Sequence, residues 1–165
     1  MYYALVTTSS EPGFQRHAAV PGEGAVSDNA AIIRGIYDAF LRGDITAVVA
    51  AMDEQIEWNE AEQVTYWRGD PFIGPHAVLT GVFARLPQDF DNFSIEILRM
   101  VAAGDTVLVE GRYRATARAT GKPLDAQVAH VFDLRDGKIV RFQEYTDTWH
   151  FAQVTGITPH EGAVA

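Results

Sequence analysis

Residues 93–148 read FSIEILRMVAAGDTVLVEGRYRATARATGKPLDAQVAHVFDLRDGKIVRFQEYTDT, and apolar and polar side chains alternate along most of this segment. A period of two is typical of β-strands with one buried face. Glycine-containing turns at 103–105, 120–122 and 135–137 divide the segment. They predict hairpins between four strands, over 93–101, 106–119, 123–134 and 138–148. Consecutive hairpins predict an antiparallel sheet.

The region before this segment has a helical period instead. Apolar side chains recur at helical spacing over 32–41, after the capping candidates Ser27 and Asp28. A Gly-Asp pair at 43–44 ends this predicted helix and caps a second one, which reaches residue 52. The two helices form a predicted helical hairpin.

Apolar alternation over 55–61 then predicts a short strand. A third helix is expected to begin at Pro75, a residue suited to a first helical position, and to end at Pro87. Helices followed by consecutive hairpins predict an α+β domain in which helices cover one face of the sheet. A long curved sheet covered in this way leaves a hollow between the two layers.

The composition narrows the classes of function. A net charge of −9 disfavours nucleic acid and anionic membrane surfaces as partners. The chain has no cysteine, so disulfides and thiolate metal sites are excluded. No apolar run approaches the roughly 20 residues of a membrane span, and the N-terminus lacks the pattern of a secretion signal. We therefore expect a cytoplasmic protein.

Three regions are expected along the chain. Residues 1–26 are rich in Pro and Gly without periodicity and predict a loosely ordered extension, the alternative being a strand at 2–7 on a sheet edge. Residues 27–150 are the expected domain, and 151–165 a C-terminal tail.

Two stretches resemble a known family. IYDAFLRGDITAVVAAMDEQIEW, residues 36–58, is similar to the opening of nuclear transport factor 2-like domains, and HVFDLRDGKIVRFQEYTDT, residues 130–148, to their closing hairpin. Within that superfamily the chain most resembles SnoaL-like polyketide cyclases and ketosteroid isomerase-like proteins. The resemblance implies a cone-shaped curved antiparallel sheet with about three N-terminal helices around a deep pocket. It also implies homodimers formed through the sheet.

The resemblance also assigns candidate residues. The oxyanion-binding tyrosine of the isomerases matches Ile36, so that this tyrosine is expected to be missing. Their general base matches Asn59 or Glu60, and their oxyanion aspartate matches His130. The cyclases and related epoxide hydrolases place a catalytic carboxylate on the last strand, which matches Glu144. The Arg-x-Asp pair of the epoxide hydrolases is replaced by the sequence at 112–114, where the aspartate is absent.

Strand alternation supports two of these candidates independently. It places Val140, Phe142, Glu144 and Thr146 on one face of the last strand, and His130 between Val128 and Phe132 on the neighbouring strand. A carboxyl group in an apolar hollow has a raised pKa and suits acid–base chemistry, and an imidazole there can shuttle protons. The alternatives are a structural salt bridge for Glu144 and a core histidine for His130.

Aromatic side chains are candidates for the walls of a ligand pocket. They are Trp58, Tyr66, Trp67, Phe72, Tyr113 and Phe142, although each alone also fits ordinary core packing. Asp147 is predicted to be structural or at the dimer face. The histidines show no metal-ligand spacing and no cofactor motif is present, so neither a metal nor a cofactor is expected.

These observations predict a cofactor-independent enzyme that moves protons on a small hydrophobic carbonyl or polyketide-like molecule. The reaction classes that remain open are cyclisation, isomerisation, dehydration and epoxide opening. His130 and Glu144 would exchange the proton, and Asn59 or Glu60 would hold the reacting oxygen. The alternative is a noncatalytic binding domain of the same fold.

Overall fold

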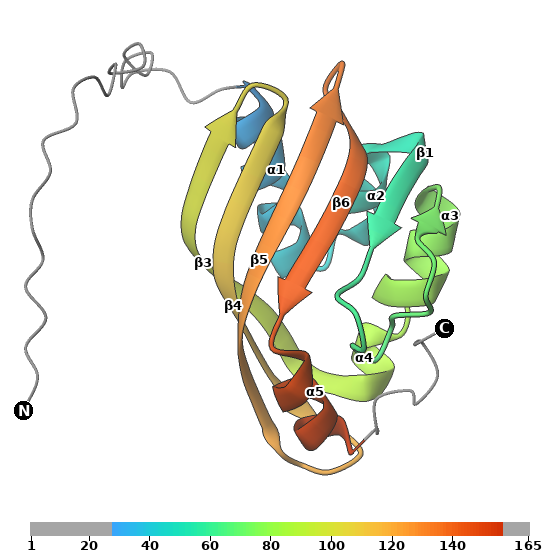
Figure 1. Ribbon diagram of the computed structural model, residues 1–165, viewed down its shortest axis with the longest axis vertical. Helices are drawn as coiled ribbons and strands as arrows, with labels where there is room; N and C mark the ends of the chain where they lie inside the picture. The colour runs from blue at the N-terminus through green and yellow to red at the C-terminus, as the bar shows by residue number, and fades with distance from the viewer. Residues whose placement is uncertain (1–27, 157–165) are drawn as a thin grey trace, which may run out of the picture.

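The computed structural model describes residues 28–156 (Figure 1). Helices occupy the first part of this region and long strands the second. In chain order the elements are α1 (Asp28–Leu41), α2 (Ile45–Ala50), β1 (Met52–Asn59), β2 (Phe72–Ile73), α3 (Pro75–Val78), the π-helix η1 (Leu79–Phe83), α4 (Leu86–Asp89), β3 (Phe90–Ala103), β4 (Thr106–Ala117), β5 (Pro123–Arg135), β6 (Lys138–Thr146) and α5 (Thr148–Thr155).

The strands form one six-stranded sheet in the order β2-β1-β6-β5-β4-β3. All neighbours pair antiparallel except β1 and β6, which are parallel. Figure 1 shows α1 and α2 behind the sheet, which curves around them. The predicted α+β class with a curved, largely antiparallel sheet is confirmed.

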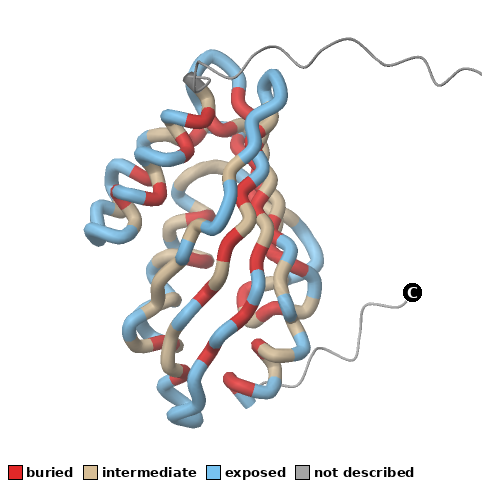
Figure 2. Tube along the Cα trace, turned by 90° about the vertical axis from the view of Figure 1, so that its left-hand side faces the viewer, coloured by how far each residue is buried: buried red, intermediate tan, exposed pale blue. Residues whose placement is uncertain are grey.

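Alternation of side chains gives the sheet two distinct faces. Along β5 every second residue from Leu124 to Leu134 is buried, while the residues between them are exposed or half-buried (Figure 2). The buried face packs against the helices and forms the main apolar core. Functional side chains on this inner face are therefore shielded from solvent.

The third helix differs from its prediction. It begins at Pro75 as expected, but continues as the π-helix η1 and is followed by the separate short helix α4. Pro87 lies in the first turn of α4 instead of ending a helix, because a proline at this position has no backbone hydrogen bond to lose. The apolar stripe was read correctly, whereas the change of helical period leaves no clear mark in the sequence.

Helix α5 was not predicted. It begins after Asp147, whose carboxylate accepts a hydrogen bond from the backbone N–H of His150 (2.9 Å), so Asp147 is an N-cap. Phe151 and Val154 of this helix are buried in the core. The folded unit thus continues past residue 150, where the sequence analysis placed the start of a tail.

A register shift between β5 and β6 changes one predicted face. The pairing skips Val140, so that Leu134 pairs with Ile139 while Asp133 pairs with Arg141. Ile139 is therefore fully buried and Val140 only half-buried. Phe142 and Glu144 keep the inner face that alternation assigned to them.

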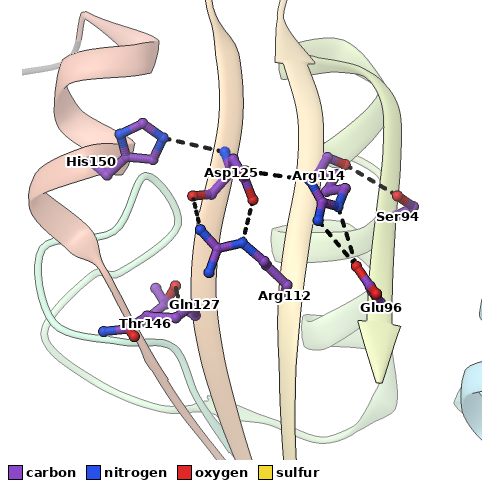
Figure 3. Close-up of polar contacts among 8 residues, drawn as sticks. All are labelled: Ser94, Glu96, Arg112, Arg114, Asp125, Gln127, Thr146 and His150. Atoms are coloured by element: carbon purple, nitrogen blue, oxygen red, sulfur yellow. Dashed lines mark hydrogen bonds and ion pairs between the residues drawn. The ribbon is translucent and has the colours of Figure 1, made fainter. Parts of the chain in front are cut away.

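The outer face of β3, β4 and β5 carries exposed ion pairs (Figure 3). Arg112 pairs with Asp125, and Arg114 pairs with both Asp125 (3.3 Å) and Glu96 (3.2 Å). The hydrogen bond from Arg112 is the main cause that lowers the pKa of Asp125. Exposed pairs of this kind contribute little stability each, so they mark the solvent side of the sheet and not its core.

The described helices include none that is long and apolar enough to span a bilayer. The alternative strand at residues 2–7 and the capping candidate Ser27 lie outside the described residues.

Candidate active site

A cavity lies between the inner face of the sheet and the helices. The cavity has a volume of about 70 Å³, which is several times the volume that one water molecule needs. Its walls are mostly apolar and aromatic. The lining residues are Ile36, Tyr37, Phe40, Val48, Met52, Trp58, Glu60, Val64, Tyr66, Val82, Phe83, Leu86, Phe93, Ile95, Tyr113, His130, Phe132, Ile139, Phe142, Glu144 and Phe151.

Three of the four predicted catalytic residues line this cavity. His130 and Glu144 are each 4% exposed, and Glu60 is 9% exposed. His130 and Glu144 are directly opposite each other in the β5–β6 register, as their matching alternation predicted. The sheet therefore brings both side chains into one apolar enclosure.

Asn59 does not line the cavity. Side chains alternate between the two faces of the sheet along β1, and Trp58 faces the cavity. Asn59 therefore faces the other side, and Glu60 faces the cavity again. The Asn59 side-chain amide donates instead to the backbone carbonyl of Phe142 (3.2 Å) and ties β1 to β6. Of the two residues that the sequence left open, only Glu60 contacts the cavity.

Four of the six predicted aromatic residues line the cavity, namely Trp58, Tyr66, Tyr113 and Phe142. Trp58 stacks on its cross-strand neighbour Phe142, with ring centroids 3.7 Å apart. Phe72 and Trp67 do not line it, contrary to the prediction. The Phe72 ring packs onto Gly81 of η1, so closely that a Cβ on that glycine would lie 2.1 Å from the ring.

A chain of short hydrogen bonds crosses the polar end of the cavity. The Tyr37 hydroxyl is 2.5 Å from His130 Nδ1, and His130 Nε2 is 2.7 Å from the Tyr113 hydroxyl. The Tyr113 hydroxyl donates to Glu144 Oε1 (2.6 Å). The Tyr113 hydroxyl thus joins His130 to Glu144.

Counting hydrogens defines the direction of this chain. Tyr113 has one hydroxyl proton and gives it to Glu144, so its oxygen accepts from His130 Nε2–H. In a neutral ring Nδ1 then has no proton and accepts from the Tyr37 hydroxyl. Each donor in the chain points toward Glu144.

The imidazole is held neutral by its surroundings. Burial lowers the pKa of His130 from 6.5 to about 3, because it disfavours the charged form of the ring. The imidazole is therefore neutral at pH 7 even though Glu144 is joined to it through Tyr113. The neutral His130 ring orients the hydrogen bonds between the hydroxyls of Tyr37 and Tyr113 and carries no charge.

Glu60 and Glu144 form a pair of buried carboxyl groups. Burial, the charge of Glu144 and a hydrogen bond to it raise the pKa of Glu60 well above its ordinary value. Trp58 Nε1 donates to Glu60 Oε1 (2.6 Å), which opposes this rise in part. Glu60 therefore holds its proton more tightly than a free glutamic acid does.

Hydrogen bonds oppose the effect of burial on the pKa of Glu144, which is raised overall. Burial raises its pKa, but hydrogen bonds from the Tyr113 hydroxyl, the backbone N–H of Ala61 (3.0 Å) and Glu60 all lower it. Two carboxyl groups so close together share one proton, because two buried charges of the same sign repel. One base and one acid thus lie side by side.

Tyr37 is the functional candidate that the sequence analysis missed. Ile36 was assigned to the position of the isomerase tyrosine, and the tyrosine was taken as absent. In α1 it is Tyr37, 4% exposed, that faces the sheet and reaches His130. Its helical spacing of four from the buried Ile33 was the signal that could have identified it.

The cavity has the parts for proton transfer but not those of a metal centre. Within residues 28–156 no group of three or more acidic, histidine or cysteine side chains is placed to hold a metal ion. A carboxylate with a raised pKa beside a protonated carboxyl group can remove one proton and deliver another.

Together the curved sheet, the helical cover and the enclosed cavity define a domain of the nuclear transport factor 2-like class. A model of the SnoaL-like domain family matches residues 33–142, and the chain belongs to that family.

Solved structures of the same fold agree with this assignment. An NTF2-like protein of Burkholderia thailandensis is 33% identical, with 79% of this chain and 98% of that chain covered and a TM-score of 0.73. TerC, co-crystallised with polyporic acid, is 24% identical over 79% and 99% of the two chains, with a TM-score of 0.71. A protein of Catenulispora acidiphila with a ketosteroid isomerase-like fold, in complex with trimethylamine, is 18% identical over 78% and 94%, with a TM-score of 0.65. A search of curated proteins found no match.

Proposed function

We propose that this chain is an acid–base enzyme that acts, without a cofactor, on a small hydrophobic carbonyl or polyketide-like molecule. The observation that carries the proposal is the pair of buried carboxyl groups, both with a raised pKa, at the polar end of an aromatic cavity. Cyclisation, isomerisation, dehydration and epoxide opening all need one group that removes a proton and one that supplies it.

In the proposed reaction Glu144 is the base and Glu60 the acid. Glu144 accepts a proton from a carbon next to the carbonyl, while Glu60 gives its proton to the carbonyl oxygen. The product of this step is an enol, and it leaves Glu144 protonated and Glu60 ionised. Return of the proton to a different carbon, or loss of a leaving group, completes the turnover and restores the pair.

The remaining polar residues act as positioning residues in this proposal. His130, with a pKa of about 3, is too weak a base to take the substrate proton at neutral pH. Instead its Nε2–H fixes the Tyr113 hydroxyl, which in turn holds Glu144. Tyr37 fixes the His130 tautomer from the other side.

The test is the pH profile of turnover on a panel of such molecules. Activity should rise with pH as Glu144 ionises, with this limb at higher pH than the ionisation of a free glutamic acid, because burial raises the pKa of Glu144. Tyr113→Phe removes a hydrogen bond that lowers the pKa of Glu144, so the limb should move to higher pH.

Tyr145→Phe is the matched control, since Tyr145 lies on the outer face of β6 and is 58% exposed. The rising limb of its pH profile should lie at the same pH as that of the wild type. An unmoved limb in Tyr113→Phe would mean that Tyr113 serves packing alone and that another group sets the profile.

A noncatalytic binding domain of this fold remains the second candidate. It is favoured by one observation, the short hydrogen bonds that already satisfy His130 and both tyrosines without a substrate. One protein of this fold was co-crystallised with polyporic acid and another is in complex with trimethylamine, so the fold alone does not define the ligand.

We also propose that two copies of the chain associate through the outer face of the sheet. Tyr145, Leu108 and Val131 present apolar surface there, and Leu108 lies beside Val131 in the β4–β5 register. Light scattering at micromolar concentration should give twice the monomer mass, and Leu108→Asp should reduce it to the monomer. Leu41→Asp, at an exposed site on α1, is the control that should leave the mass unchanged. A monomeric wild type would contradict the proposal.

A further inference from the structure

Most hydrogen-bond donors at the polar end of the cavity are already used. The hydroxyl of Tyr37, the Nε2–H of His130 and the hydroxyl of Tyr113 each donate to the next group of the chain. The Trp58 indole N–H donates to Glu60. Among the described lining residues, the Tyr66 hydroxyl and the carboxyl proton of Glu60 are the donors that these hydrogen bonds leave out.

Hydrogen-bond acceptors, by contrast, remain available. The Tyr37 oxygen donates its proton and accepts none of the hydrogen bonds described above. Each carboxyl oxygen of Glu60 and Glu144 has more than one lone-pair site, and few of these are occupied. A ligand that brings a hydrogen-bond donor therefore finds more partners than one that brings only acceptors.

The charge of the cavity points the same way. None of the described residues that line it is Lys or Arg, and His130 is neutral. The carboxyl pair carries one negative charge, which hydrogen bonds alone stabilise. A buried anion without a cationic partner is costly, so a bound cation would relieve this cost.

The walls next to the carboxyl pair also suit a cation. Trp58 stacks on Phe142, and Phe142 lies edge-on to His130 with ring centroids 5.0 Å apart. Phe83 meets Trp58 at 5.6 Å in a T-shaped contact. Aromatic faces attract cations, Trp most strongly, and they equally accommodate the apolar body of a ligand.

We propose that the molecule bound in this cavity is a small organic cation, with its ammonium group against Glu60 and Glu144 and its apolar body among the aromatic rings. The inference rests on the proposed function, because it takes the same cavity as the substrate site, and it adds the charge class of the substrate. A hydrophobic carbonyl compound with a basic nitrogen satisfies both.

The experiment compares three probes of similar shape by calorimetry and NMR titration of the full chain. Phenyltrimethylammonium is the cation, tert-butylbenzene is its neutral isostere, and benzoate is an anion. The cation should bind roughly tenfold more tightly than the neutral probe, which is the range of a desolvated cation–π and charge contact, and benzoate should bind weakest. The affinity for the cation should rise with pH as Glu144 ionises, and that for tert-butylbenzene should not change.

Glu144→Gln should lower the affinity for the cation roughly tenfold and leave that for tert-butylbenzene unchanged. Glu57→Gln, at an exposed site on β1, is the matched control that should change neither. If Glu144→Gln does not fold, the pH dependence of the wild type decides. Equal affinity for cation and isostere, tightest binding of benzoate, or no binding of the cation would each overturn the inference.

Failure of this inference differs from failure of the proposed function. A preference for the cation with no turnover of any candidate molecule would support a cation-binding domain and reject the enzyme. Turnover that depends on Glu144, together with equal affinity for the cation and its isostere, would support the enzyme and reject the cation.

Discussion

Glu144→Gln is expected to lower turnover by a hundredfold or more, the usual contribution of a general base. The amide is nearly isosteric with the carboxyl group, but it cannot accept a proton from carbon at neutral pH. Its single oxygen can keep one of the two hydrogen bonds that Glu144 accepts, from the Tyr113 hydroxyl at Oε1 or from the Ala61 N–H at Oε2, while its NH2 group takes the other position. The loss should therefore appear in kcat, measured at the pH optimum of the wild type, while the circular dichroism spectrum stays unchanged.

Glu57→Gln provides the control for the same chemical change, because Glu57 lies exposed on β1, next to Trp58 but facing solvent. Its turnover should equal that of the wild type. A folded Glu144→Gln variant with full activity would show that the carboxylate is structural and would favour the binding-domain alternative.

The expected effect depends on elements that are far apart in the sequence. Glu144 lies on β6, while its hydrogen-bond partners are Tyr113 on β4 and Ala61, two residues beyond the end of β1. Alternation could assign each side chain to a face, because that property depends only on the local period. It could not predict that the Tyr113 hydroxyl lies between His130 and Glu144, because this contact depends on the register of three strands.

The same distinction explains the differences in the fold. The hairpins were predictable because their turns carry Gly at positions with positive φ, as at Gly104, Gly121 and Gly137. The parallel pairing of β1 with β6 joins segments about 80 residues apart and has no local signal. The π-helix η1 and helix α5 were missed for a related reason, since tertiary packing stabilises both.

The candidate site was predicted where a face assignment was enough. Glu144 and His130 follow from strand phase, whereas the resemblance alone indicated Glu60 and left it open against Asn59. Tyr37 was missed because the resemblance directed attention to Ile36, its neighbour on α1. One residue turns a helix by about 100°, so neighbouring residues on a helix point to different faces.

Acid pH is expected to weaken the fold through His130. The unfolded state takes up a proton on this residue near pH 6.5, while the folded state does not until about pH 3. The unfolded state therefore binds more protons in this window, and the contribution of His130 to stability is lost as the pH falls from 6.5 to 3. The full loss from this one residue is on the order of 5 kcal/mol, from about 1.4 kcal/mol per unit of pKa shift.

The carboxyl pair has the opposite dependence. Because the pKa of Glu60 is raised in the folded state, the folded chain keeps a proton that the unfolded chain loses above about pH 4.5. The contribution of Glu60 is thus complete below that pH and is lost as the pH rises toward its folded pKa. The two residues partly compensate in the wild type between pH 4.5 and 6.5, so only variants can separate them.

Urea unfolding of His130→Gln and Glu60→Gln at pH 4.5, 5.5 and 6.5 would therefore give slopes of opposite sign. The difference in free energy of unfolding, His130→Gln minus wild type, should increase as the pH falls, by up to about 1.4 kcal/mol per pH unit, because glutamine does not titrate. The same difference for Glu60→Gln should increase as the pH rises. His76→Gln, an exposed site on α3, serves as the control and should run parallel to the wild type. Parallel lines for all three variants would mean that neither buried group differs in protonation between the folded and unfolded chains. The neutral imidazole and the shared proton, on which the acid–base mechanism depends, would then have to be abandoned together.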